Sequence, residues 1–166
     1  YDSNKKNIDE ISNEGQNRIK IMSLVHDMLY HGDNSNTIEI NAFIHQIAIH
    51  LDSFSNQKKN IVTKIECADL NFDMDTAIPL GLILNELLTN ALKHSRPEKE
   101  ALEISISITS EINNNYKLIV SDNGEKINNL IIPEKAQSFG LHMIYLLSKQ
   151  LNGNFIYEYN GKNNFI

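Results

Sequence analysis

The stretch from Pro79 to Ser95 contains three polar side chains whose types and spacing suit a metal-bound polyphosphate. Glu86, Asn90 and Lys93 stand at positions i, i+4 and i+7, so a helix would place them on one face. The carboxylate can orient or deprotonate a nucleophile, the amide oxygen can ligate Mg²⁺, and the ammonium can neutralise phosphate charge. The same pattern also fits an ordinary solvated helix face, which usually lies opposite an apolar stripe.

The apolar residues of this stretch recur at helical spacing and predict a helix with one broad face in the core. Asp75 or Thr76 can cap its start, and Pro79 falls in or near the first turn, where a missing N–H matters least. The apolar positions are Leu80, Gly81, Leu84, Leu87, Leu88, Ala91 and Leu92. The polar row lies off this stripe.

The composition excludes several classes of protein. With 166 residues, 41% of them apolar, the chain is long enough for one full core. A net charge of −6 without a basic cluster argues against a nucleic-acid binder. The single cysteine, Cys67, excludes an intrachain disulfide and a multi-cysteine metal site. No apolar run approaches the roughly 20 residues that a membrane helix needs.

Periodicity divides the chain into a long N-terminal helix and a second module. The first helix is expected from about Asn7 to Tyr30, and its two apolar stripes are typical of a helix in a bundle. A polar break after His31 predicts a boundary between residues 1–31 and residues 37–166. A second helix is expected over Thr37–Phe54.

Strands are predicted on both sides of the central helix. They cover residues 61–66, 70–73, 102–108, 116–121 and 154–159, and a further helix covers about 138–150. Adjacent strands joined by short turns indicate a mixed sheet covered by helices on one face, an α+β fold with two layers.

Two further segments carry polar chemistry. A predicted strand runs into Asp122-Asn123-Gly124, where the aspartate can accept a hydrogen bond from an exocyclic amine such as that of adenine. Gly124 permits close backbone approach or a positive φ. Gly140 stands at a helix start, whose unpaired N–H groups can face a phosphate. Each motif alone is common, but their order and separation together predict a nucleotide site.

These segments resemble the ATP-binding domain shared by sensor histidine kinases, gyrase, Hsp90 and MutL, known as the Bergerat or GHKL fold. Asn85–His94 resembles the N box of this family, Asp122–Gly124 its G1 box and Phe139–Leu141 its G2 box. Within the family, the central helix is most similar to the HisKA_2 and HWE branch of bacterial histidine kinases. Gln16–Tyr30 resembles the second helix of that branch's dimerisation and phosphotransfer hairpin.

The resemblance implies ATP and Mg²⁺ as cofactors and transfer of the γ-phosphoryl group to a histidine. It assigns the metal to Asn90, and to Glu86 a catalytic role in assisting transfer or organising the metal. The nucleotide-binding residues that it implies are Asn90, Lys93, His94, Asp122, Gly124, Gly140 and Leu141. His94 is interpreted as part of the pocket wall.

The resemblance also implies partners and a location. The phosphoryl group would pass to the receiver domain of a response regulator, the full-length protein would be a homodimer, and this domain would be cytoplasmic, with membrane attachment left open. The family's acceptor histidine belongs to a helix that precedes Asn7–Tyr30, so His26 is interpreted as a non-acceptor. Because the chain opens inside a predicted helix and ends inside a predicted strand, we expect a fragment that binds ATP but shows little autophosphorylation alone.

Two departures from the family pattern leave other functions open. The G1 box usually continues Asp-x-Gly-x-Gly, but Glu125 and Lys126 follow Gly124 here, and the lid over residues 125–137 contains no glycine. One alternative is a GHKL-type ATPase, since Glu86 stands where gyrase-like members keep a water-activating glutamate. The other is a degenerate nucleotide-binding or dimerisation module without kinase activity.

Overall fold

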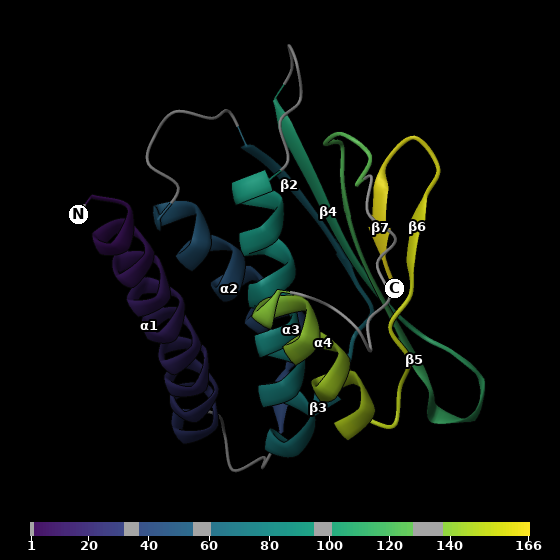
Figure 1. Cartoon of the computed structure of the whole chain (residues 1–166). Helices are drawn as coiled ribbons and strands as arrows, with labels where there is room; N and C mark the ends of the chain where they lie inside the picture. The colour runs from purple at the N-terminus through teal and green to yellow at the C-terminus, as the bar shows by residue number, and fades with distance from the viewer. Residues whose placement is uncertain (1, 32–36, 55–60, 95–100, 128–137) are drawn as a thin grey trace.

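The computed structural model describes residues 2–31, 37–54, 61–94, 101–127 and 138–166. Helices form one layer and a mixed sheet forms the other, with the helices covering one face of the sheet (Figure 1). The helices are α1 (Asp2–His31), α2 (Ile40–Phe54), α3 (Met74–His94) and α4 (Phe139–Gln150), with a 3₁₀ turn at Ile112–Asn114. The strands are β1 (Ile38–Glu39), β2 (Ile61–Cys67), β3 (Asn71–Phe72), β4 (Leu102–Ser110), β5 (Tyr116–Asp122), β6 (Tyr157–Tyr159) and β7 (Asn163–Phe165).

The main sheet has the strand order β2-β4-β5-β7-β6. β2 runs parallel to β4, and the other neighbours are antiparallel, so the predicted mixed sheet and α+β fold are confirmed. The register pairs Asp122 with Ile104 on β4 and with Asn163 on β7. Asp122 therefore ends a central strand, on the same face as the buried Ile104.

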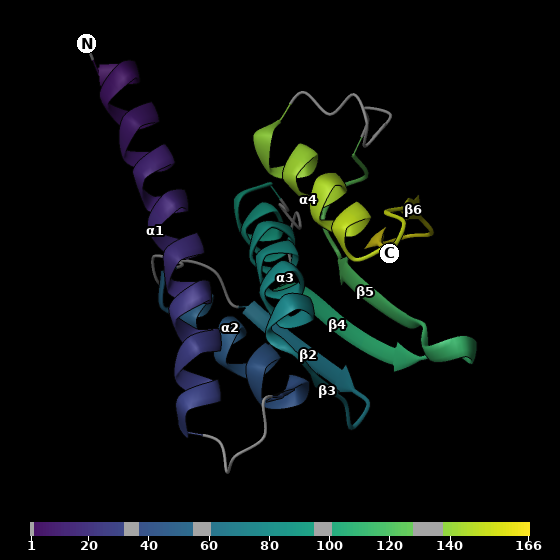
Figure 2. The same cartoon turned by 90° about the horizontal axis from the view of Figure 1, so that it is seen from below.

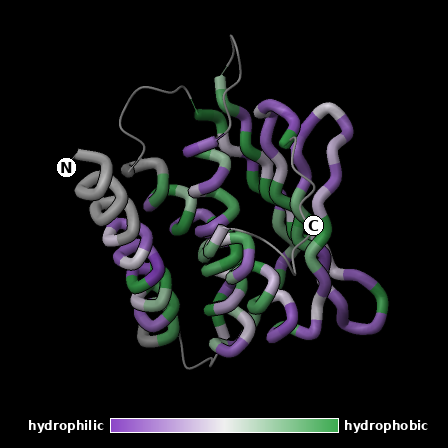
Figure 3. Tube along the Cα trace, viewed as in Figure 1, coloured by the Kyte–Doolittle hydropathy of each residue, from purple (hydrophilic) through white to green (hydrophobic). Residues whose placement is uncertain are grey.

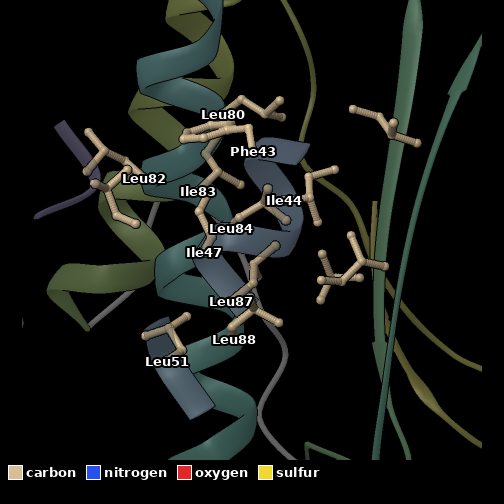
Figure 4. Close-up of a cluster of buried hydrophobic side chains, with 14 of the residues drawn as sticks. Phe43, Ile44, Ile47, Leu51, Leu80, Leu82, Ile83, Leu84, Leu87 and Leu88 are labelled. Atoms are coloured by element: carbon tan, nitrogen blue, oxygen red, sulfur yellow. The ribbon is translucent and has the colours of Figure 1, made fainter. Parts of the chain in front are cut away.

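The core lies between the sheet and the inner sides of α2 and α3. The strict alternation along β4 buries Leu102, Ile104, Ile106 and Ile108, as predicted. Figure 3 shows hydrophobic positions concentrated where the helices meet the central strands. Figure 4 shows the side chains of α2 and α3 that gather there, among them Phe43, Ile47 and Leu84. Burial of this cluster fixes α3 against the sheet.

α3 is buried on more sides than the sequence predicts. Its predicted stripe lies in the core, but Leu82, Ile83 and Glu86 outside the stripe are buried as well. The cause is packing, since α3 contacts α1, α2, α4 and β5. The interpretation of its polar row as a solvated face is therefore wrong at Glu86.

The start of α3 also differs from the expectation. The cap is Asp73, whose carboxylate accepts a hydrogen bond from the Thr76 backbone N at 2.9 Å. Hydrogen bonding to Thr76 lowers the pKa of Asp73. The expected caps Asp75 and Thr76 lie inside the helix, and Pro79 lies beyond its first turn.

A two-residue strand replaces the expected first turn of the second helix. Ile38 of β1 pairs with Phe72 of β3, and the Ile40 backbone N donates to the Leu70 carbonyl at 2.9 Å. β3 thus pairs with β1 in a separate small sheet. A strand of two residues has no periodicity to reveal it.

α1 is one continuous helix alongside α2 and α3, on the side of the helical layer away from the sheet (Figure 2). Its buried residues Ile21 and Val25 join the core. The expected polar break falls on residues 32–36, outside the described part of the chain. Within that part, no helix has the length and apolar character needed to cross a membrane.

The close packing of α1 and α2 against Gly81 of α3 predicts the effect of adding one methyl group there. A Cβ at Gly81 would lie 2.6 Å from Phe43 Cζ and 2.8 Å from Ile21 Cγ2. We expect Gly81→Ala to lower the free energy of unfolding by about 1–3 kcal/mol through overpacking. Gly15→Ala on α1 is the matched control, because nothing lies within 4 Å of its Cβ position.

The Gly15→Ala change should raise helix propensity and stabilise the protein by up to about 1 kcal/mol. Chemical denaturation of the two variants beside the parent measures both effects. Equal changes in stability would contradict the close packing of α1 and α2 on α3 at Gly81.

Candidate active site

Asp122 is a buried carboxylate at the end of β5, with 3% of its surface exposed. Its Oδ1 accepts hydrogen bonds from the Gly124 backbone N at 2.8 Å and from Asn163 Nδ2 at 2.9 Å. Charge-assisted bonds of this kind hold a carboxylate in one orientation. A fixed, buried acceptor is suited to an exocyclic amine such as that of adenine.

Asn163 on β7 connects Asp122 to the segment that follows Gly124. Its Nδ2 donates to Asp122 and to the Glu125 carbonyl at 3.1 Å. Its Oδ1 accepts from the Tyr157 hydroxyl at 2.8 Å, and that hydroxyl accepts from the Ile127 backbone N at 3.3 Å. The network therefore ties the segment after Gly124 to β6 and β7.

Glu86 is the most heavily bonded of the polar residues on α3. The Arg18 guanidinium of α1 donates from Nε to Oε1 at 3.0 Å and from Nη2 to Oε2 at 3.2 Å. Asn85 Nδ2 adds a bond to Oε1 at 3.2 Å. Glu86 is 5% exposed, and a buried carboxylate requires such partners.

The start of α4 approaches the same ion pair. A Cβ at Gly140 would lie 2.7 Å from Glu86 Oε2, so glycine lets the start of α4 approach this carboxylate closely. The guanidinium carbon of Arg18 lies 4.9 Å from the centre of the Phe139 ring, a cation–π contact. The predicted N box and G2 box therefore meet at Glu86.

The first turn of α4 is capped within the chain. The Ser138 hydroxyl accepts from the Leu141 backbone N at 3.4 Å. The helix from Phe139 to Gln150 confirms the expected element. Leu141 lies half-buried in its first turn.

The other polar residues of α3 lie towards its C-terminal end. Asn90 is half-buried, while Lys93 and His94 are exposed. Lys93 Nζ donates to Glu14 Oε1 of α1 at 2.6 Å. Glu14 Oε2 lies 3.7 Å from the Arg18 guanidinium. Lys93, Glu14, Arg18 and Glu86 thus form one connected ion network between α3 and α1.

The donor set fits a magnesium ion that arrives with a nucleotide. In the described residues, no group of three or more His, Cys, Asp or Glu side chains could hold a metal by itself. Mg²⁺ is usually bound by one or two protein oxygens together with substrate phosphates and water. The amide oxygen of Asn90 can supply one such ligand.

Lys126, which stands in the G1 box where the family pattern has a glycine, lies near β6. Lys126 Nζ lies 5.6 Å from the centre of the Tyr159 ring on β6. From residue 128 onward, the predicted lid lies outside the described residues.

A cavity of about 540 Å³ lies away from these polar groups. It is lined by the N-terminal half of α3, the C-terminal end of α4 and the turn between β4 and β5, and it includes none of the predicted site residues. Cavity size alone does not define a nucleotide site, which needs convergent polar groups. We therefore place the candidate site at Asp122 and the ion network around Glu86.

A family model described as histidine kinase-, DNA gyrase B-, and HSP90-like ATPase matches residues 75–164, more than half of the chain. The chain belongs to this family. A second model, the HisKA_2 histidine kinase family, matches residues 2–55, which contain α1 and α2. The predicted histidine protein kinase, with a GHKL catalytic domain of the HisKA_2 type, is confirmed, and ATP use follows from the family.

Solved histidine kinase structures share the fold. The kinase domain of the Erythrobacter litoralis EL346 blue-light activated histidine kinase matches with a TM-score of 0.77 at 18% identity, over 92% of this chain and 71% of that chain. The Acinetobacter baumannii histidine kinase AdeS matches with a TM-score of 0.68 at 18% identity, over 99% of this chain and 80% of that chain. The mycobacterial sensor histidine kinase MprB matches with a TM-score of 0.63 at 14% identity, over 78% of this chain and 92% of that chain. The search of curated proteins gave no match.

Sequence reasoning missed Asn163 and Arg18 for different reasons. Asn163 stands two residues before Phe165, so strand alternation turns both towards the helices, and a polar residue at an inward position was a usable signal. Arg18 lies 68 residues from Glu86, and no local pattern reveals that pairing.

The hydrogen bonds of Asn163 predict that its substitution destabilises the protein. Asn163→Ala removes donors from Asp122 and the Glu125 carbonyl and an acceptor from Tyr157. We expect the free energy of unfolding to fall by about 1–3 kcal/mol, because buried polar groups lose their partners. Asn164→Ala is the control, since the Asn164 side chain bonds to Ser121 and Asn160 instead.

Thermal denaturation of both variants gives the comparison. The control should lose less stability, because it lies in a more exposed position where water can replace the lost bonds. A larger loss of stability in Asn164→Ala would show that the hydrogen bonds of Asn163 are not the main stabilising contacts around Asp122.

Proposed function

We propose that Asp122 binds the adenine amine of ATP and that the C-terminal half of α3 and the start of α4 bind its phosphates. The observation that carries this proposal is the buried Asp122 carboxylate, held in one orientation by Gly124 and Asn163. A carboxylate at this position can accept a hydrogen bond from the exocyclic amine of adenine.

The proposed position of the phosphates rests on the charge of Lys93 and on the close packing of the start of α4 against α3. Gly140 lies close to Glu86 in the first turn of α4, where backbone N–H groups and the helix dipole favour anions. Lys93 supplies positive charge, and Leu141 and His94 line the walls. Asn90 would hold Mg²⁺, which when bound neutralises charge on the phosphates.

The reaction is transfer of the γ-phosphoryl group to a histidine. An imidazole nitrogen forms a bond to the γ-phosphorus as the bond to the β–γ bridging oxygen breaks, and ADP leaves. Catalysis of this transfer depends on positioning and charge neutralisation. The acceptor is proposed to come from the hairpin helix that the family places before α1. His26 is an exposed residue beside Asp27 and is not proposed as acceptor.

The finer assignments of partners and modules are also proposals. Residues 1–31 form part of a dimerisation and phosphotransfer hairpin, and residues 37–166 form the catalytic domain. α1 exposes Ile19 and Met22, which a partner helix would cover in a homodimer of the full-length protein. A response regulator receiver domain then accepts the phosphoryl group, in the cytoplasm.

Kinase chemistry is better supported than hydrolysis at Glu86. A water-activating glutamate needs an oxygen available to a water molecule. Both oxygens of Glu86 instead accept bonds from Arg18, and Oε2 also faces Gly140. Glu86 is therefore proposed to organise the site.

Calorimetric titration with a non-hydrolysable ATP analogue tests the adenine assignment. With Mg²⁺ present, the parent should bind, and Asp122→Ala should weaken binding by tenfold or more, the loss of about 1.4 kcal/mol or more expected for a charge-assisted hydrogen bond. Asp69→Ala, an exposed aspartate in the turn after β2, is the matched control and should bind like the parent.

Circular dichroism of each variant separates lost binding from lost folding. Parent-like affinity in folded Asp122→Ala would refute the adenine assignment. Absence of binding in the folded parent would instead favour a degenerate module.

Asn90 is tested by the metal dependence of binding. If its amide oxygen ligates Mg²⁺, then adding Mg²⁺ should raise the affinity of the parent for the analogue but have a much smaller effect on Asn90→Ala. Titrations with and without Mg²⁺ measure this difference. An undiminished magnesium effect in Asn90→Ala would remove Asn90 from the metal site.

A further inference from the structure

Two residues of α1 hold the two charged residues of α3 that the proposed function places beside the phosphates. Glu14 bonds to Lys93 at 2.6 Å, and Arg18 bonds to Glu86 at 3.0 and 3.2 Å. We infer that Glu14 and Arg18 belong to the nucleotide site and set its affinity for ATP, with Glu14 competing against the phosphates for Lys93. This inference rests on the proposed role of Lys93.

The two contacts follow from one alignment of helices. α1 runs antiparallel to α3, because residues 14, 18 and 21 of α1 meet residues 93, 86 and 81 of α3 in reverse order along the two helices. Glu14 and Arg18 are one turn apart and share a face of α1. A position of α1 that satisfies Glu86 therefore also places Glu14 on Lys93. Figure 1 shows α1 running from top to bottom and α3 from bottom to top.

Arg18 is the positioning residue of this pair. Its side chain is 19% exposed and that of Glu86 is 6% exposed, so the ion pair is mostly withdrawn from water. Removal of Arg18 would leave a buried carboxylate without its main partner and would destabilise the fold. Phe139 lies against the guanidinium and links this position to the start of α4. Arg18 thereby keeps α1 in one register on α3, while Glu14 changes the affinity for ATP.

Glu14 opposes nucleotide binding in two ways. Its carboxylate occupies a donor of the Lys93 ammonium and neutralises the charge that phosphates would otherwise meet. Its negative charge also repels a polyphosphate brought to Lys93. The two side chains are 33% and 38% exposed, so water weakens both effects. Release of this pair is expected to strengthen ATP binding by about two- to fivefold, the range for exposed ion pairs.

Glu14→Gln tests the inference, because it removes the charge and keeps the side chain's size. The dissociation constant of the non-hydrolysable ATP analogue, measured with Mg²⁺ by calorimetry, should fall by about two- to fivefold. Glu111→Gln is the matched control, since it makes the same change of net charge at an exposed turn before β5, at the strand end opposite Asp122. Its affinity should equal that of the parent. A gain of affinity is informative because damage to the fold would produce a loss.

A double-mutant cycle with Lys93→Met separates this inference from the proposed function. Lys93→Met should weaken binding, and in that background Glu14→Gln should no longer strengthen it. If Lys93→Met leaves affinity unchanged, the proposed role of Lys93 fails. If Lys93→Met weakens binding but Glu14→Gln gives an affinity equal to or lower than the parent's, the role of Lys93 stands and the competition by Glu14 is refuted.

Discussion

The ion pair between Arg18 and Glu86 is the contact on which the arrangement of the helices depends. Glu86 lies on a helix that is packed by other elements on almost every side, so its charge is withdrawn from water. A buried carboxylate is costly unless a partner of opposite charge and good geometry reaches it. The two-pronged guanidinium of Arg18 supplies that partner from α1. The region matched by the HisKA_2 model and the region matched by the ATPase model therefore meet at this carboxylate.

The ion pair defines position, while apolar contacts supply most of the attraction. A buried ion pair is often no more stabilising than a well-packed apolar pair of similar volume, but breaking it leaves a lone charge. Ile21 and Val25 of α1 provide the apolar area, and Gly81 lets α3 come close to Ile21. Displacing α1 by one turn would lose the packing of Ile21 against Gly81 and would leave the buried Glu86 carboxylate without Arg18. We infer that α1 has one favoured register on α3.

The features that could be predicted from sequence are those governed by short-range order. The alternation along β4 and the helical period of α3 depend on neighbours within one element, and both appear in the structure as expected. The motif order around Asp122 and Gly140 identified the family, which the family model then showed. Local sequence also contained an unused signal at Asn163, a polar residue at an inward strand position.

Other features depend on contacts that no local pattern contains. The amphipathic reading of α3 assumed one buried face, but the docking of α1 and α4 buried Glu86 on another. The partner of Glu86 is 68 residues away, and β1 exists only because β3 pairs with it. Asp73 replaced the expected caps because its side chain, and not that of Asp75, reaches the first turn. In each case tertiary packing decided between options that the sequence left open.

The two ends of the proposed nucleotide site differ in what holds them in place. The Asp122 end is fixed by Gly124, two residues along the chain, and by Asn163 on the adjacent strand, so the sheet alone preforms it. The Glu86 and Lys93 end takes its geometry from α1 and α4, which are separate elements that pack onto α3. A movement of α1 would therefore change the charge presented to phosphates and leave the carboxylate that we propose to bind the base unaltered. Such a division lets a helix of the HisKA_2 region act on the phosphate end of ATP without disturbing recognition of the base.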